Sequence, residues 1–218
     1  DKIQTHIKTG YANNYAEPSF YLSTTLLLFF GLLYAIHKTK LKDKSVLILL
    51  VVVLALTNLR LFIIFHDMCH RSYFPTDERT KDYKGFNFNV AKIIEPLCSF
   101  SAEYWNKTHS AHHKAHGNLN IYDDTRSVYT SSDYEALSDF QKNMYNIVRF
   151  PPLFFGLAPI YIYWLNRFIE KEWIWLIKYA SFLGILYYLG GWKLVIAFLV
   201  SQYLAGTLGI MLFHLQHQ

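Results

Sequence analysis

Residues 45–70 read SVLILLVVVLALTNLRLFIIFHDMCH, an apolar run that ends in two histidines. Residues 45–59 carry no charge, and the run continues past Arg60 as far as Phe65. About 20 apolar residues cross the hydrocarbon core of a bilayer, so this stretch predicts a membrane-spanning helix. The end of that helix would place His66 and His70 at one face of the membrane.

Three further runs have the same character, namely residues 18–36, 173–189 and 194–213. Lys178 is the single charge among them. A buried helix of a soluble protein would explain one such run, but four in 218 residues predict an all-α membrane protein. We expect two transmembrane helical hairpins, 18–65 and 173–217, which together make four spanning helices. The first would turn in the lysine-rich stretch 37–45, and the second at Gly190-Gly191.

The topology follows from where the histidines fall. If all of them lie on one side, an even number of crossings must separate His116 from His217, yet three apolar runs lie between them. The short run 147–165 contains Pro151, Pro152 and Pro159, so we expect an interfacial helix there. The polar segment 66–146 would then form a histidine-rich cap facing the cytosol. Residues 1–218 make one domain by this interpretation.

Charge gives one argument against this orientation. Residues 37–45 carry four lysines and one aspartate, and the positive-inside rule would place them in the cytosol. We keep the histidines on the cytosolic side and expect these lysines to contact lipid headgroups. The net charge of +5 is spread along the chain, without the concentrated basic face of a nucleic-acid-binding protein.

Eight of the ten histidines fall into three clusters. His66 and His70 are four residues apart, a spacing that places both imidazoles on one face of a helix. His109, His112 and His113 follow the pattern H-x-x-H-H, in which 112 and 113 point about 100° apart and could serve two metal ions. Imidazole is the commonest metal ligand, so we expect a metal site, with a solvated histidine-rich loop as the alternative.

Neighbouring polar residues have less certain roles. His217 ends the last apolar run and is predicted to be a ligand, whereas His214, one turn earlier, either contacts a ligand or is a bystander. Asp67 either fixes the tautomer of an imidazole or caps the helix. His116 extends the helix face of His112 and is a ligand, a residue that supports one, or an ordinary surface residue.

Other site types are disfavoured. No glutamate lies between the histidines of an i, i+4 pair, as a zinc protease helix requires, and no nucleophile-elbow or phosphate-loop motif is present. Cys69 and Cys98 provide no disulfide framework, and Cys69 is expected to be a small packing residue.

Three segments resemble the integral-membrane fatty acid desaturases, most closely the acyl-lipid delta-12/omega-6 type. They are residues 63–74 (IIFHDMCHRSYF), residues 105–113 (WNKTHSAHH) with Gly117-Asn118-Leu119 after them, and residues 213–218 (FHLQHQ). Met68 and Cys69 stand where this family usually has Cys-Gly. The resemblance implies a di-iron centre with six histidine ligands, His66, His70, His109, His112, His113 and His217, and with Asn118 beside the second box.

The resemblance also implies an activity. Two iron ions would use O2 and external electrons, from ferredoxin or cytochrome b5, to introduce a cis double bond into an acyl-lipid or acyl-CoA. The basic residues Lys107, Lys114 and Arg126 either dock the electron donor or form an ordinary solvated surface. The protein would be a multi-pass membrane protein of the endoplasmic reticulum, a plastid or a bacterium.

The final histidine box of the family has no counterpart in this sequence, which begins without methionine and stops at Gln218. We therefore expect a C-terminally truncated piece of a longer protein that has no turnover on its own.

Two other readings remain at this stage. A related di-iron membrane hydroxylase, acetylenase or carotenoid ketolase would carry similar histidine boxes. A non-catalytic metal-binding membrane protein or transporter is the alternative from a different class. Transporters place ionisable residues near the bilayer midplane, however, whereas these histidines follow the ends of apolar runs.

Overall fold

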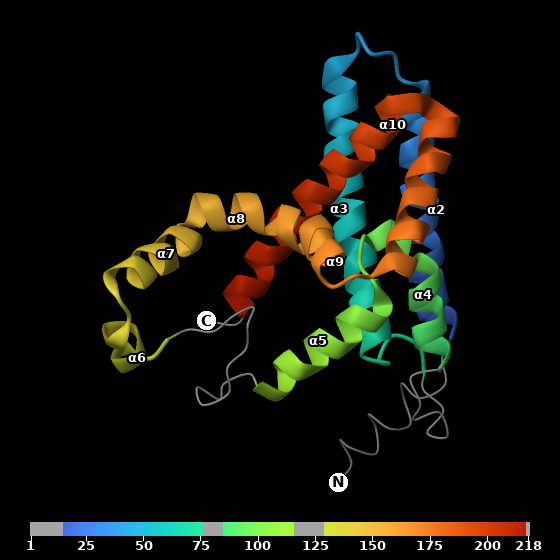
Figure 1. Ribbon diagram of the computed structural model, residues 1–218. Helices are drawn as coiled ribbons and strands as arrows, with labels where there is room; N and C mark the ends of the chain where they lie inside the picture. Colours follow the sequence, from blue (N-terminus) through green and yellow to red (C-terminus); the bar gives the residue numbers. More distant parts are fainter. Residues whose placement is uncertain (1–14, 76–84, 116–128, 217–218) are drawn as a thin grey trace.

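The computed structural model describes residues 15–75, 85–115 and 129–216, and in these ranges every regular element is a helix. The labels follow Figure 1 and begin at α2. The elements are α2 (Ala16–Lys38), α3 (Lys44–Cys69), α4 (Phe86–Cys98), α5 (Ala102–Ala115), α6 (Ser131–Ala136), α7 (Asp139–Arg149), α8 (Pro151–Ile160), the π-helix η1 (Tyr161–Leu165), α9 (Asn166–Ile169) and α10 (Trp173–Gln216).

Helices α2 and α3 form the first predicted hairpin and pack side by side (Figure 1). They contain 23 and 26 residues, which at 1.5 Å per residue gives about 35 and 39 Å, enough to cross a bilayer core. The chain between them turns in the lysine-rich stretch, where polar and charged residues end both helices. One boundary differs from the prediction, because α3 continues to Cys69 and so includes His66 in its last turn.

Helix α10 reverses direction at Gly191. This residue has φ 64° and ψ −162°, a conformation open essentially to glycine alone, and it breaks an otherwise helical stretch of 44 residues. Figure 1 shows the chain rising to this point and then descending beside α3. Lys193 Nζ donates hydrogen bonds to the carbonyl oxygens of His37 and Thr39, at 2.6 and 3.0 Å. The turns of the two hairpins therefore lie together at one end of the bundle.

We expect Gly191→Ala to destabilise the protein by about 1–3 kcal/mol, because the side chain would strain this backbone although space for it exists. The measurement is the thermal unfolding midpoint of the purified protein in detergent. Gly31→Ala is the control, since a methyl group there meets no atom within 4 Å. Equal midpoints for the two variants would contradict the role assigned to Gly191.

Helix α4 is a core element within a segment that the sequence suggested was a polar cap. Its inward side chains are buried: Phe88, Ala91, Ile94, Glu95 and Cys98. The helix is tied to its neighbours through polar contacts, with Cys98 Sγ 3.8 Å from the carbonyl oxygen of Leu61 and Gln202 Nε2 2.7 Å from that of Leu97. Cys69 and Cys98 are both buried free thiols. Helix α4 therefore contributes buried apolar side chains from within the segment 66–146, which the sequence predicted to form a polar, histidine-rich cap.

Residues 139–169 form two helical stretches bent by 75°. Helices α7 and α8 lead away from the bundle, whereas η1 and α9, with the buried side chains of Tyr163 and Arg167, pack against it (Figure 1). The bend lies at Phe150, which is extended because a residue before proline avoids the helical region. Pro151 and Pro152 then begin the next helix, where missing N–H groups cost nothing. The predicted helix 147–165 differs from the structure at both ends, since the continuous stretch runs from Pro151 to Ile169.

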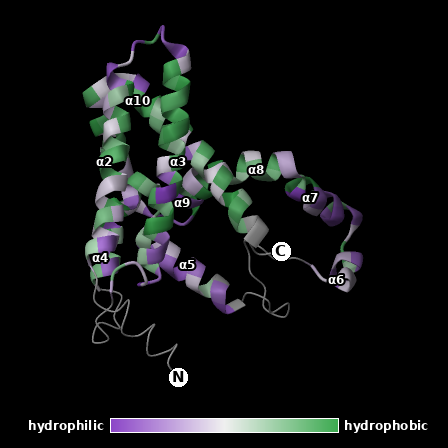
Figure 2. Ribbon diagram, turned by 180° about the vertical axis from the view of Figure 1, so that it is seen from behind, coloured by the Kyte–Doolittle hydropathy of each residue, from purple (hydrophilic) through white to green (hydrophobic). Residues whose placement is uncertain are grey.

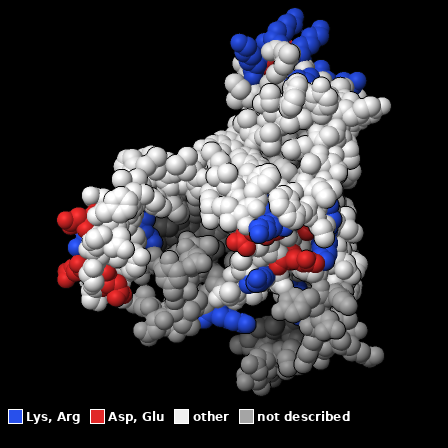
Figure 3. Space-filling model, viewed as in Figure 1, with Lys and Arg blue, Asp and Glu red and all other residues white. Residues whose placement is uncertain are grey.

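Among the described residues, three helices are long and apolar enough to cross a membrane. They are Ala16–Lys38, Lys44–Cys69 and Trp173–Phe213, and the bent pair would make a fourth if it counted as one span. Figure 2 shows hydrophobic residues covering α2, α3 and α10. On the face seen in Figure 3, a surface without charged residues separates the lysines at the hairpin end from the charges lower in the view.

Candidate metal centre

The last turn of α3 supplies two imidazoles. His66 lies within the helix, and His70 follows directly after its final residue, so the i, i+4 spacing brings both rings to one face. Their centroids are 4.4 Å apart, and the two Nε2 atoms are separated by 3.2 Å. This pair lies at the end of the bundle opposite the hairpin turns, near α5 (Figure 1).

Helix α5 supplies a second pair with the same spacing. His109 and His113 have ring centroids 4.5 Å apart and Nε2 atoms 3.0 Å apart. His109 is 4% exposed, which makes it the most enclosed of the four histidines. The helical reading of H-x-x-H-H is therefore confirmed for positions 109 and 113.

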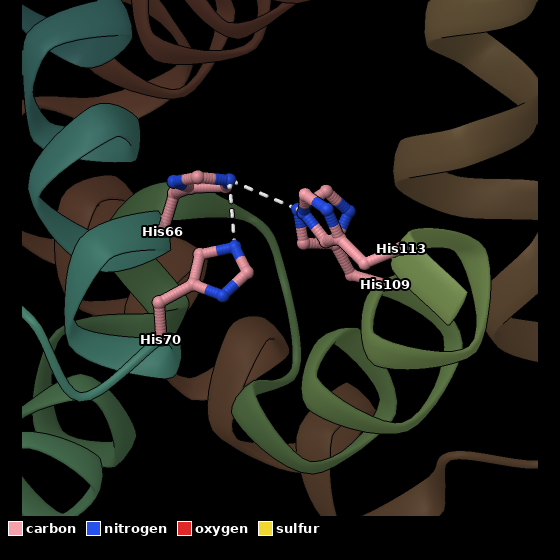
Figure 4. A group of neighbouring side chains, drawn as sticks. All are labelled: His66, His70, His109 and His113. Atoms are coloured by element: carbon pink, nitrogen blue, oxygen red, sulfur yellow. Dashed lines mark hydrogen bonds between the residues drawn. The ribbon is translucent and has the colours of Figure 1, made fainter. Parts of the chain in front are cut away.

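The two pairs meet. His66 Nε2 lies 2.9 Å from His109 Nε2, and one ring nitrogen of each of the four histidines lies within 4.8 Å of the others. Figure 4 shows the rings from α3 and α5 turned toward a common point. Two helices thus build one cluster of donor atoms, in which the contacting residues His66 and His109 are 43 positions apart in sequence.

The donor atoms fit a cation better than they fit one another. The Nε2 atoms form a chain of three contacts, from His70 through His66 and His109 to His113. A neutral imidazole nitrogen carries either one hydrogen or one lone pair. No placement of hydrogens turns all three contacts into ordinary two-centre hydrogen bonds, whereas a cation between four lone pairs satisfies all four Nε2 atoms.

The spacing of the nitrogens agrees with this interpretation. Ligand nitrogens about 2.1 Å from an ion and at right angles to one another are about 3.0 Å apart. The observed contacts are 2.9, 3.0 and 3.2 Å. Imidazole donors suit iron, zinc, copper and nickel, so the geometry indicates a transition metal without selecting one.

Asp67 lies where it can orient one of the rings. Its Oδ1 is 3.0 Å from His66 Nδ1, and the carboxylate is half exposed. A hydrogen on Nδ1, held by this carboxylate, leaves the Nε2 lone pair of His66 directed at the cluster.

An aromatic wall covers the apolar side of the cluster. Trp105 stacks on His109 with centroids 4.6 Å apart and an interplanar angle of 23°. Phe62 packs against Trp105 at 5.2 Å, and Phe213 lies 5.9 Å from His66. Trp105 was expected at the start of the second histidine segment but not against a ligand ring, and Phe62 and Phe213 were not expected near the site, although Trp105 and Phe62 each precede a histidine by four positions. Such an apolar shell limits the access of water to a metal site.

The other predicted site residues are not placed. The side chains of His112 and His214, and the whole of His116, Asn118 and His217, lie outside the part of the chain that the structure describes. Their roles remain predictions.

Acidification should destabilise the metal-free protein. Burial, reinforced by His66 and His113, lowers the pKa of His70 below 6.5, although Asp67 acts in the opposite direction. The unfolded chain consequently takes up a proton at a higher pH than the native chain does, so stability falls as the pH drops through about 6.5. The measurement is the unfolding midpoint between pH 5 and 8 in the presence of chelator. A His70→Gln variant with the same pH dependence as the wild type would contradict this assignment.

The chain is similar to proteins of known family. The family model described as "Fatty acid desaturase" matches residues 44–218, which include all four clustered histidines. A protein of Bacillus subtilis (strain 168) described as "Fatty acid desaturase" is 28% identical over 215 residues. That alignment covers 90% of this chain and 57% of the relative, so the chain spans a little over half of the relative's length. No solved structure gives a significant match.

Proposed function

Because the chain belongs to the fatty acid desaturase family, we propose that it carries the histidine-ligated centre of an enzyme that introduces a cis double bond into an acyl chain. The observation that carries the proposal is the convergence of His66, His70, His109 and His113 within the region matched by the family. The chain is an integral membrane protein, as its three to four apolar helices indicate. The acyl-lipid delta-12/omega-6 type is the narrower assignment that we propose.

The four clustered histidines would hold one iron ion, and His112 and His217 would complete a centre of two. Bound iron would supply the oxidation. O2 would take one hydrogen from each of two adjacent methylenes and, with two electrons and two protons, would end as two waters, leaving the alkene. The electrons would come from ferredoxin or cytochrome b5. The exposed Lys107 and Lys114 on α5 are candidate contacts for such an acidic carrier.

The chain's own residues prepare this centre. The low pKa of His70 favours the neutral imidazole that a metal needs. Asp67 would hold the tautomer of His66, and the ring of Trp105 would hold the plane of His109. The apolar surfaces of α3 and α10 would surround an acyl chain and exclude water from it. A methylene has no polar group to bind, so these surfaces would hold it near the histidines.

We propose a topology in which both hairpins cross the membrane and the histidine end faces the cytosol. It is supported by the shared location of the two hairpin turns, which the Lys193 hydrogen bonds to His37 and Thr39 bring together. Residues 151–169 would lie along the interface as one continuous helical stretch. The exposed lysines at positions 38, 40, 42 and 44 oppose this orientation under the positive-inside rule.

Cysteine labelling tests the orientation. Lys42→Cys at the hairpin end and Lys107→Cys on α5 are both exposed positions, whereas the native cysteines are buried. In intact cells, a membrane-impermeant maleimide should label Lys42→Cys but label Lys107→Cys only after permeabilisation. The opposite pattern would invert the topology, and equal labelling of both positions would refute it.

Fatty acid analysis tests the activity. The gene product, at its full length, would be expressed in a yeast that makes only simple monounsaturated fatty acids, beside a His109→Ala control. Gas chromatography–mass spectrometry should show a new diunsaturated acid in the wild type alone. Hydroxylated or acetylenic acids would show that the enzyme catalyses a related oxidation instead of desaturation. An unchanged fatty acid profile, in a protein that binds iron, would show that the host's acyl chains are not its substrate.

A further inference from the structure

An ion pair joins α4 to the first arm of α10, with the carboxylate buried and the lysine side chain 41% exposed. Glu95 of α4 is 4% exposed, and its Oε1 accepts a 2.6 Å hydrogen bond from Lys178 Nζ. Lys178 is the only charged residue in the first arm of α10, residues 173–190. A carboxylate buried without a partner is costly, so the lysine accounts for how Glu95 can lie inside.

The same glutamate also begins the helix that carries the second histidine pair. Its Oε2 accepts a 2.9 Å hydrogen bond from the backbone N–H of Ala102, the first residue of α5. The first N–H groups of a helix have no partner within the helix, and a carboxylate there also complements the helix dipole. Glu95 therefore connects α4, α5 and the first arm of α10 through one side chain.

The turn between α4 and α5 is folded around this residue. The carbonyl oxygen of Glu95 accepts hydrogen bonds from the N–H groups of Ser99 and Phe100. Ser99 adopts a left-handed conformation, with φ 59°, which is uncommon for a residue other than glycine. A strained residue of this kind persists where its surroundings hold it, and the bonds to Glu95 contribute to that hold.

The direction of α5 decides where its histidines lie. His109 is seven residues after Ala102, or about 10.5 Å along the helix. A small tilt at the start of α5 would thus displace His109 and His113 from His66 and His70. Metal ligands must be held to within about 0.5 Å, so the centre depends on how the first turn of α5 is fixed.

We propose that Glu95 is a positioning residue of the metal centre, and that its pairing with Lys178 fixes the start of α5 so that His109 and His113 face His66 and His70. This inference rests on the metal centre in the proposed function but not on the reaction. Stability alone does not explain the pair, because the lysine side chain is 41% exposed and an ion pair with a solvent-exposed partner contributes little to stability.

Four variants of the full chain in detergent separate positioning from stability. Glu95→Gln keeps an acceptor for Ala102, Lys178→Met leaves the carboxylate unpaired, and the double variant Glu95→Met/Lys178→Met removes both charges together. Lys193→Met is the matched control, since this lysine also joins α10 to another part of the chain, at the opposite end of the bundle.

The first readout combines two measurements on each variant, namely the Co²⁺ affinity from visible absorption and the thermal unfolding midpoint. The double variant should fold with a midpoint near that of the wild type and yet bind Co²⁺ about 10- to 100-fold more weakly, as when residues that support ligands are removed. Lys178→Met should weaken binding similarly, and Glu95→Gln less. Lys193→Met should lower the midpoint without changing the affinity. A double variant with wild-type affinity would overturn the proposal.

The second readout does not need metal. Spin labels at Ile63→Cys on α3 and Lys107→Cys on α5, both exposed, report the distance between the two helices by pulsed electron paramagnetic resonance. The distance distribution should broaden in the double variant and not in Lys193→Met. An unchanged distribution in the double variant would overturn the positioning role. A wild type that binds no Co²⁺ would instead refute the metal centre, while the distances still decide whether Glu95 holds α5.

Discussion

Replacing His109 by alanine should abolish metal binding at the four-histidine cluster and, under the proposed function, lower product formation more than about a hundredfold. His109 is the most enclosed of the four, and its Nε2 contacts those of both His66 and His113. Alanine removes a central ligand and also the ring on which Trp105 stacks. Removing a residue that merely supports a ligand lowers metal affinity or activity roughly 10- to 100-fold, and removing a ligand itself should have a larger effect.

The measurements are metal content per purified chain and product by mass spectrometry. His37→Ala is the matched control, because this histidine lies at the hairpin end of the bundle, where Lys193 binds its carbonyl oxygen. The control should keep its metal and its activity. Full metal occupancy in His109→Ala would show that the clustered imidazoles are not the ligands.

Gly206→Ala should destabilise the protein by about 3 kcal/mol, at the upper end of the usual cost of overpacking. A Cβ atom at Gly206 would lie 2.2 Å from Tyr163 Cε2 and 3.2 Å from Pro159 Cβ. Tyr163 is 5% exposed and cannot move outward freely. Its ring packs on Phe100 at 4.9 Å, and Phe100 packs on Trp105 at the same distance, so the displacement should extend to the wall beside His109.

Two glycines of the same helix are controls for this variant. A methyl group at Gly184 meets nothing within 4 Å, and one at Gly209 makes an ordinary 3.5 Å contact with Leu59. Both alanine variants should unfold within about 1 kcal/mol of the wild type, since glycine inside a helix is itself unfavourable by about that amount. A Gly206→Ala protein as stable as these two would show that α10 and η1 do not approach as closely as the structure indicates.

Hydropathy was sufficient to predict α2, α3 and both arms of α10. An uncharged run of about 20 residues predicts a membrane-spanning helix, because within a bilayer only helices and closed barrels satisfy the hydrogen bonds of the backbone. Gly190-Gly191 was also a sufficient signal for the second turn, although only Gly191 leaves the helical conformation. Helix α4 was missed because Lys92 and Glu95 make residues 86–98 look polar.

The residues by themselves predicted the histidine pairs, and their assembly into one centre was implied only by the resemblance to a family. The spacings 66/70 and 109/113 place two rings on one helix face by local geometry alone. Nothing in either segment indicates that His66 and His109 lie 2.9 Å apart, nor that Trp105 stacks on one of the ligands. The ion pair between Glu95 and Lys178 spans 83 residues and was equally invisible.

The sequence by itself determined the apolar spans, the turn glycines and the two i, i+4 histidine pairs, because each depends on periodicity within one short segment. Tertiary structure alone decided that the pairs face one another, that α4 is buried and that Glu95 lies between three helices. These features depend on contacts between residues 43 to 105 positions apart, whose formation follows from the packing of whole helices.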